Sequence, residues 1–270
     1  MDTPAGKSRP ECQPCPGNGS LAIVGTGPGH PGYLAPRALA AISHARYVFG
    51  NAAYLRPLED LLDGREIIRD SLGTQIDRAK KVIGLAESFP TVIVSGGDPG
   101  VYGVAGIVLD EIERSGSRIE VEIIPGITAA TAAASRVGSP LSGDYATISL
   151  SNLITPMEVI GQRLEAVFSV KIPVVLYNPK SRGKPHNLGI AIEHARRHLP
   201  AQTPVALVKN ALRDGEEITI STLGEIETVL DRVDMHTTVI IGGEESRIWR
   251  MNDHVRGIIT PRGYHRKYVY

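Results

Sequence analysis

Leu21-Ala-Ile-Val-Gly-Thr-Gly-Pro-Gly29 forms a short apolar run that ends in a glycine-rich turn. Two further apolar runs end in the same way, at Ser95-Gly-Gly-Asp-Pro-Gly-Val-Tyr-Gly103 and at Ile124-Pro-Gly-Ile-Thr-Ala-Ala130. A stretch with helical patterning follows each turn, which predicts repeated strand, turn and helix units. Strands that alternate with helices are typical of a parallel sheet covered by helices, so the predicted fold class is α/β.

The predicted elements fall into two sets. In the first set, the strands are 21–24, 47–50, 91–95 and 121–124, and the helices are 36–45, 76–89, 101–115 and 128–137. In the second set, the strands are 146–150, 174–177, 205–208, 218–222 and 238–241, and the helices are 158–168 and 188–198. The breaker-rich link Gly138-Ser-Pro-Leu-Ser-Gly-Asp144 suits a domain boundary. We therefore expect a disordered tail over 1–20, an N-terminal α/β domain over 21–140 and a C-terminal α/β domain over 141–270.

The composition is that of an ordinary enzyme, with 42% hydrophobic and 21% charged residues. Lys plus Arg and Asp plus Glu both number 29, so the formal net charge is zero and no global field favours nucleic acid or an anionic membrane. No apolar run approaches the roughly 18 residues that a membrane span needs. Residues 1–20 also lack the apolar core of a signal peptide. These features predict a cytoplasmic protein that binds neither nucleic acid nor membrane.

The two cysteines lie close together, as Cys12-Gln-Pro-Cys15, ahead of the first predicted strand. This spacing cannot join distant parts of a fold. A C-x-x-C pair can ligate a metal or act as a redox dithiol, but a zinc site needs four ligands and redox pairs usually start a helix. Because prolines surround the pair, we favour a disordered tail over a functional dithiol, and we predict no metal site.

The turn after the first strand superficially resembles a dinucleotide-binding loop, because its glycines allow positive φ and close approach of a ligand to the backbone. A dinucleotide fingerprint, however, opens its helix directly. Here Pro28 and Pro31 stiffen the loop and delay the helix to about Pro36. A nicotinamide-dependent dehydrogenase is therefore a disfavoured alternative.

The second turn carries Asp98, just before the helix predicted over 101–115. Ligands of open α/β sheets bind outside the carboxyl ends of the strands, so a cofactor is expected at this turn. The simpler interpretation is that Asp98 caps the helix, by accepting N–H bonds at the positive end of the helix dipole. The residues alone leave both interpretations open.

Taken in order, the motifs G-x-G-P-G, S-G-G-D-P-G-V-Y and P-G-I-T-A resemble those of the tetrapyrrole (corrin/porphyrin) methylase family over nearly all of residues 21–264. Finer motifs are similar to the branch that methylates C-17 of precorrin-3B or cobalt-factor III. They are Thr147-Ile-Ser-Leu-Ser151 with Leu153-Ile-Thr-Pro156, Leu176-Tyr-Asn-Pro-Lys-Ser-Arg-Gly183, Val208-Lys-Asn-Ala211, Thr237-Thr-Val-Ile-Ile-Gly242 and Thr260-Pro-Arg-Gly-Tyr264.

The resemblance implies two α/β domains with S-adenosylmethionine held in a cleft between them, and a homodimer. It also implies a set of residues that line the methyl donor, namely Gly97, Asp98, Val101, Tyr102, Thr128, Ala129, Tyr177, Ala211 and Thr238. The sulfonium makes this donor its own electrophile, so methyl transfer needs an aligned acceptor more than a strong base. The implied reaction is methylation of C-17 with contraction of the macrocycle, in cobalamin biosynthesis.

Ring contraction moves protons and therefore calls for an acid or base. The candidates on loops expected to face the substrate are His30, Asp98 and Tyr102, although His30 is more simply a solvated turn residue. The macrocycle carries carboxylates, which Arg can bind bidentately. The candidate substrate-binding residues are therefore Lys180, Arg182 and Lys184, with a solvated loop as the alternative and with Arg37 and Arg136 as lesser candidates.

Two further alternatives stay open. The chain could act at another macrocycle carbon within the same family. It could also be a non-catalytic carrier that binds a corrinoid without turning it over.

Overall fold

The computed structural model describes residues 19–69, 74–180 and 186–269. Contacts divide the chain into two compact units. Unit 1 comprises Met1–Val24, Ala35–Ser95 and Val104–Ile124, and unit 2 comprises Gly25–Leu34, Gly96–Gly103 and Pro125–Tyr270. This division differs from the expected boundary at 140, because unit 1 ends at Ile124 and two glycine-rich loops from the N-terminal half belong to unit 2.

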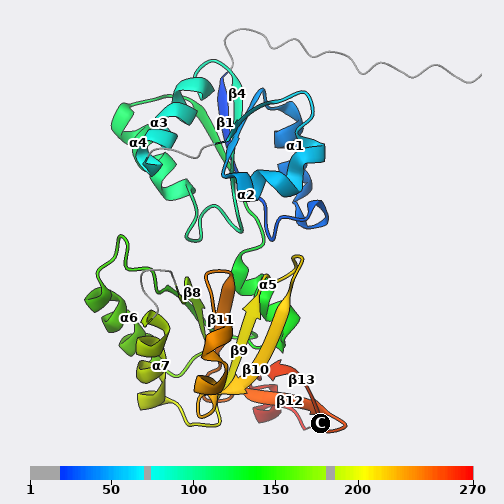
Figure 1. Ribbon diagram of the computed structural model, residues 1–270, viewed down its shortest axis with the longest axis vertical. Helices are drawn as coiled ribbons and strands as arrows, with labels where there is room; N and C mark the ends of the chain where they lie inside the picture. Colours follow the sequence, from blue (N-terminus) through cyan, green and yellow to red (C-terminus); the bar gives the residue numbers. More distant parts are fainter. Residues whose placement is uncertain (1–18, 70–73, 181–185, 270) are drawn as a thin grey trace, which may run out of the picture. The chain divides into compact units, whose positions relative to one another are not determined.

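Unit 1 contains a five-stranded sheet in the order β3-β2-β4-β1-β5 (Figure 1). The strands are β1 (Ser20–Gly25), β2 (Tyr47–Gly50), β3 (Glu66–Arg69), β4 (Pro90–Ser95) and β5 (Glu120–Ile124). The pairs β1/β5, β2/β3 and β2/β4 are parallel, as predicted. The carboxyl ends of these strands therefore lie at one edge of the sheet.

Helices cover both faces of this sheet. They are α1 (Pro36–His44), α2 (Ala52–Leu55), α3 (Gln75–Ala86) and α4 (Ala105–Ser115). α3 and α4 pack their apolar sides against Leu21, Phe49 and Ile93, which share one face of the sheet. Successive strand residues point to opposite faces, and helices cover both faces, so these buried strands are apolar along most of their length.

Unit 2 contains a second five-stranded sheet, in the order β10-β9-β11-β8-β7. Its strands are β7 (Ala146–Ser149), β8 (Val174–Tyr177), β9 (Pro204–Lys209), β10 (Glu217–Thr222) and β11 (Thr237–Ile241). β7 and β8 are parallel, but β11 is antiparallel to both β8 and β9, and β10 is antiparallel to β9. The expected parallel arrangement therefore holds for the pairs β1/β5, β2/β3 and β2/β4 of unit 1. It is wrong for most of the sheet of unit 2. There a short loop joins β9 to β10, and such a loop can connect only antiparallel neighbours.

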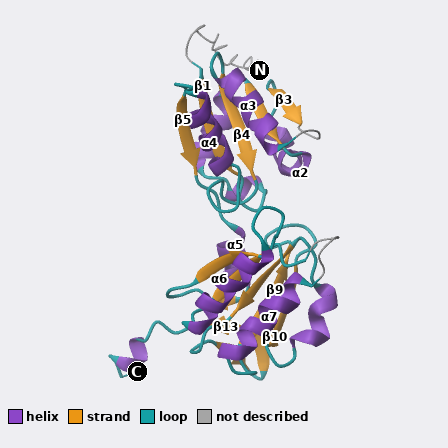
Figure 2. Ribbon diagram, turned by 90° about the vertical axis from the view of Figure 1, so that its left-hand side faces the viewer, coloured by secondary structure: helices purple, strands orange, loops and turns teal. Residues whose placement is uncertain are grey.

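The helices of unit 2 are α5 (Ala129–Arg136), α6 (Met157–Ser169) and α7 (Asn187–His198). α6 and α7 bury one face of the sheet, and α5 buries the other (Figure 2). A small second sheet is made of β6 (Gly138–Ser139), β13 (His254–Ile259) and β12 (Arg247–Met251). β13 adds Ile258 to the core on the α5 side.

None of the helices among the described residues combines the length and the apolar character that crossing a membrane requires.

A charged cluster joins the outer surfaces of α6 and α7. Glu165 on α6 lies 2.8 Å from Nδ1 of His194 and 2.7 Å from Nε2 of His198, both on α7. Arg197 lies 3.3 Å from the same carboxylate. The hydrogen bonds from His194 and His198 lower the pKa of Glu165 from 4.5 to about 2. The carboxylate of Glu165 is therefore more readily ionised in the folded chain than in the unfolded chain.

We expect this cluster to lose its stabilising effect as the pH falls from 4.5 towards 2. A carboxylate with a lowered folded pKa stabilises the fold above its unfolded pKa and stops doing so below its folded pKa. The measurement is the free energy of unfolding by urea for the wild type and for Glu165→Gln. The wild type should be more stable at pH 6, and the difference should shrink towards pH 2. A difference that does not change with pH would contradict this, and Glu158→Gln, at an exposed position on α6, is the control.

Candidate functional site

Three glycine-containing loops of unit 2 continue from the carboxyl ends of β1, β4 and β5. The first two join through a pair of backbone hydrogen bonds, since Gly27 N donates to Gly97 O at 3.0 Å and Gly97 N donates to Gly27 O at 2.9 Å. The third loop packs on them so closely that a Cβ on Gly126 would lie 2.2 Å from Gly97 O. Only glycine fits at position 126, which explains part of the P-G-I-T-A motif.

Asp98 ties two of these loops together. Its Oδ1 accepts a hydrogen bond from Gly100 N at 2.8 Å, and its Oδ2 accepts one from Gly126 N at 3.1 Å. The helix-capping interpretation of Asp98 is wrong, because α4 begins at Ala105 and its N-cap residue is Val104. The carboxylate instead fixes the loop that follows β4 against the loop that follows β5.

Gly97 has a φ of +69°, a backbone conformation that side chains with a Cβ rarely adopt. A Cβ at this position would lie 3.8 Å from Thr128 Cα and 3.9 Å from Ala129 N. Gly97 therefore faces the start of α5 at ordinary contact distance, and a larger side chain would extend along that segment.

Tyr177, the last residue of β8, caps α5 from outside the helix. Its hydroxyl accepts a hydrogen bond from Ala130 N at 2.8 Å and lies 2.6 Å from Oγ1 of Thr128. Thr128 is the N-cap residue of α5, yet its side chain makes no capping bond to its own helix. The Tyr177 hydroxyl thus takes the role that an N-cap side chain usually has. Burial raises the pKa of this hydroxyl.

Tyr102 rests on Tyr177, with ring centroids 4.9 Å apart. Its hydroxyl donates to the carbonyl of Thr147 on β7 at 3.0 Å. Tyr102 has a φ of +52°, which is costly for a bulky residue, and Asn178, the residue after Tyr177, has the same φ. Tyr102 nevertheless leaves 54% of its surface exposed, so a ligand can reach part of this side chain.

Ala211 lies in the loop between β9 and β10, and Glu216 organises that loop. Glu216 accepts a hydrogen bond from Leu212 N at 2.7 Å and pairs with Arg136 Nε at 2.9 Å. Arg213, from the same loop, donates to the carbonyl of Pro28 in the first glycine-rich loop. The Ala211 loop is therefore attached to the loops described above.

Other candidates have local roles in the structure. His30 accepts a hydrogen bond from Gly32 N at 3.0 Å and caps a short 3-10 helix, which agrees with the turn interpretation. Val101 is half-buried, and its N–H donates to the carbonyl of Asp98. Thr238 is 7% exposed on β11, opposite Val208 of β9.

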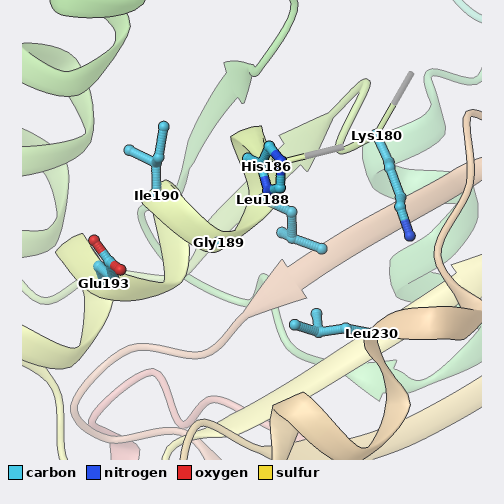
Figure 3. A pocket seen from close by; sticks show the side chains of 7 residues that line it. All are labelled: Lys180, His186, Leu188, Gly189, Ile190, Glu193 and Leu230. Atoms are coloured by element: carbon cyan, nitrogen blue, oxygen red, sulfur yellow. The ribbon is translucent and has the colours of Figure 1, made fainter. Parts of the chain in front are cut away.

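The basic candidates fall into three groups: two form ion pairs, one lines a pocket and two lie outside the described residues. Arg136 pairs with Glu216 as given above, and Arg37 pairs with Glu122 in unit 1. Lys180 lines a shallow pocket of about 290 Å³ with His186, Leu188 and Leu230 (Figure 3). Arg182 and Lys184, like Cys12 and Cys15, lie outside the described residues.

Within unit 2, Tyr177 contacts two other predicted donor-site residues, Tyr102 and Thr128. Asp98 and Gly97 are bonded to the neighbouring glycine loops, at Gly126 and Gly27. The motifs do not reveal the backbone partners of these side chains, which are the N–H groups of Gly126 and Ala130 and the carbonyl of Thr147. The P-G-I-T-A motif indicates the correct segment, but the groups that bond there are backbone N–H groups, which a sequence motif does not single out.

The comparisons with known proteins agree with these motifs. The family model of the Tetrapyrrole (Corrin/Porphyrin) Methylases matches residues 20–227. The chain is 36% identical to a probable cobalt-factor III C(17)-methyltransferase of Salmonella typhimurium, over 90% of this chain and 99% of that one. It is 38% identical to a precorrin-3B C(17)-methyltransferase of a Sinorhizobium species, over 91% of this chain and 97% of that one.

A third relative is longer. The cobalamin biosynthesis protein CbiHC of Archaeoglobus fulgidus is 36% identical over 94% of this chain, which spans only 54% of that relative.

Two solved structures are similar. The methyltransferase CobJ has a TM-score of 0.82 at 27% identity, covering 90% of this chain and 100% of CobJ. A uroporphyrin-III C-methyl transferase of Thermus thermophilus, complexed with S-adenosyl homocysteine, has a TM-score of 0.64 at 25% identity, covering 83% and 97% of the two chains.

Proposed function

Because the chain belongs to the tetrapyrrole methylase family, we propose that it methylates C-17 of precorrin-3B or cobalt-factor III, with ring contraction, in cobalamin biosynthesis. The methyl donor in this proposal is S-adenosylmethionine. The observation that carries the proposal is that two side chains hold the segment from Gly126 to Ala130 within unit 2. Asp98 accepts a hydrogen bond from Gly126 N, and the Tyr177 hydroxyl bonds to Thr128 and to Ala130 N. These residues come from three of the motifs on which the family resemblance rests.

The residues present suit this donor chemically. Gly97, Ala129 and Ala211 offer backbone without bulky side chains, so hydroxyl and amino groups of a ligand can approach peptide N–H and C=O groups. The exposed ring of Tyr102 offers a flat apolar surface of the kind that a nucleoside base requires. We assign the donor to these residues together with Asp98, Val101, Thr128, Tyr177 and Thr238.

When bound, S-adenosylmethionine supplies a methyl group already activated by its sulfonium. The task of the chain is then to position donor and acceptor, which can account for several kcal/mol of the barrier. Asp98 and Tyr177 do this indirectly, because their oxygens hold backbone N–H groups and so fix the loops in one arrangement. Tyr102 covers Tyr177 and keeps water from its face of that ring.

For the substrate, Lys180 with Arg182 and Lys184 is proposed to pair with carboxylate arms of the macrocycle. Lys180 follows the end of β8 by three residues, so it belongs to the same sheet edge as Tyr177. His30, Asp98 and Tyr102 are the proposed candidates for moving a proton during ring contraction.

The test is anaerobic incubation of the purified chain with S-adenosylmethionine and each of the two substrates, followed by mass spectrometry. We expect a product heavier by one methyl group, with nuclear magnetic resonance locating the methyl at C-17. A methyl at another carbon would assign the chain to a different activity of the same family. Titration with S-adenosylhomocysteine and NADH separately tests the dehydrogenase alternative, which requires binding of NADH. Binding of a corrinoid without methyl transfer would instead support a carrier.

The proposal includes a homodimer in the cytoplasm. Light scattering coupled to size-exclusion chromatography tests the first part, and cell fractionation tests the second.

A further inference from the structure

The loop between β7 and α6 exposes two aliphatic side chains in succession. Leu153 is 84% exposed and Ile154 is 92% exposed. Isolated apolar residues are common on protein surfaces, but two neighbouring aliphatic side chains exposed to this degree at a turn indicate a contact that the free chain leaves open.

Hydrogen bonds hold the base of this loop against β8 and α7. Leu150 N donates to the carbonyl of Tyr177 at 2.8 Å, and the buried Asn187 donates to the carbonyl of Leu150 at 2.7 Å. Asn178 donates to the hydroxyl of Ser149 at 3.0 Å. On its far side the loop runs directly into α6, which begins at Met157.

These same bonds place the loop beside the candidate site. β7 pairs in parallel with β8, with Ser149 opposite Tyr177, so both strands end at one edge. Thr147, two residues earlier on β7, holds the hydroxyl of Tyr102. The loop with Leu153 and Ile154 therefore rises from the sheet edge where β8 ends at Tyr177, and it follows β7, the strand that Tyr102 contacts.

We propose that Leu153 and Ile154 form an apolar platform that packs against the flat face of the tetrapyrrole macrocycle. This inference rests on the proposed function. A tetrapyrrole has an apolar ring face and a rim of carboxylates, which matches an aliphatic loop tip after β7 and a lysine, Lys180, shortly after the neighbouring strand β8. A second copy of the chain fits less well, because a stable interface takes about 800 Å² from each partner and two side chains supply only a fraction of that area.

We predict that the platform contributes to the affinity for the tetrapyrrole but not to the affinity for the methyl donor. In the double variant Leu153→Ser with Ile154→Ser, we expect the KM for the tetrapyrrole to rise about tenfold or more, since apolar burial is lost. The kcat and the affinity for S-adenosylhomocysteine should stay within about twofold of the wild type. The melting temperature should also stay unchanged, because both side chains are already exposed and contribute little to the core.

The control is Val170→Ser, since Val170 is 62% exposed at the other end of α6 and lies outside the platform. Its KM for the tetrapyrrole should equal that of the wild type. A Leu153→Met with Ile154→Met variant should restore the KM, because methionine keeps the apolar surface. If the double serine variant has the same KM for the tetrapyrrole as the wild type, the platform proposal is wrong. If the wild type is a dimer on light scattering and the double serine variant is a monomer with an unchanged KM, the platform contacts a second copy of the chain instead. A wild type that binds S-adenosylhomocysteine but methylates neither substrate would overturn the proposed function, and the platform with it.

Discussion

Replacing Gly97 with valine is expected to weaken binding of S-adenosylhomocysteine by at least about 100-fold, which corresponds to roughly 2.7 kcal/mol. A Cβ at this position lies 3.8 Å from Thr128 Cα, so the two γ carbons of valine would extend along the start of α5. In the proposed site that space belongs to the donor. Isothermal titration calorimetry with S-adenosylhomocysteine measures the loss.

Valine at position 97 also strains the backbone, because the φ there is +69°. A side chain in this left-handed region costs about 1–2 kcal/mol. Gly116→Val is the matched control, since Gly116 has a φ of +68°, caps α4 in unit 1 and has no atom within 4 Å of an added Cβ. Both variants should melt a few degrees lower, and only Gly97→Val should lose the ligand. If the two variants bind equally well, the donor site lies elsewhere.

Elements with strong apolar patterning could be predicted closely from the sequence. The strands predicted over 47–50 and 174–177 match β2 and β8 at both ends. Elements with weak apolar patterning could not be predicted, and the sequence does not indicate β3, α2, β6, β12 or β13. The helix predicted from residue 101 begins at Ala105 instead, because Tyr102 adopts a φ of +52° that no propensity rule anticipates.

The candidate site could be predicted as a set of segments, but its bonding could not. Asp98 meets Gly126 across 28 residues, and Tyr177 meets Ala130 across 47. Such partners depend on how three loops stack, and spacing along the chain carries no information about that. The same limit applies to Arg37 and Arg136, which have carboxylate partners 85 and 80 residues away. Only the positive charge of these two side chains marks them as lesser substrate candidates, and charge alone does not reveal a partner.

Substitution of Asp98 separates two roles that the sequence left combined, namely holding the loops and moving a proton. Both carboxylate oxygens accept backbone N–H bonds, at 2.8 Å from Gly100 N and 3.1 Å from Gly126 N. Bonds to a charged acceptor each contribute about 1.5–3 kcal/mol. We expect Asp98→Ala to lower the free energy of unfolding by about 3 kcal/mol, since it removes two such bonds. We also expect it to reduce kcat/KM at least about 100-fold, because the loops that position the donor lose their link.

Asp98→Asn decides between the two roles, because asparagine keeps one acceptor oxygen but cannot act as an acid or base. If Asp98 positions the loops, Asp98→Asn should retain part of the activity and the pH profile of kcat should keep its shape. If Asp98 moves the proton, the pH profile of kcat should lose one limb in Asp98→Asn, and the reaction should stop after methyl transfer and before ring contraction.

Asp77→Ala is the matched control for Asp98→Ala, since Asp77 accepts two hydrogen bonds from Thr74, at 3.0 and 2.8 Å, at the start of α3 in unit 1. It should reduce stability and leave the affinity for S-adenosylhomocysteine unchanged. An equal loss of affinity in Asp77→Ala and Asp98→Ala would mean that the effect comes from general destabilisation rather than from the loops at Asp98.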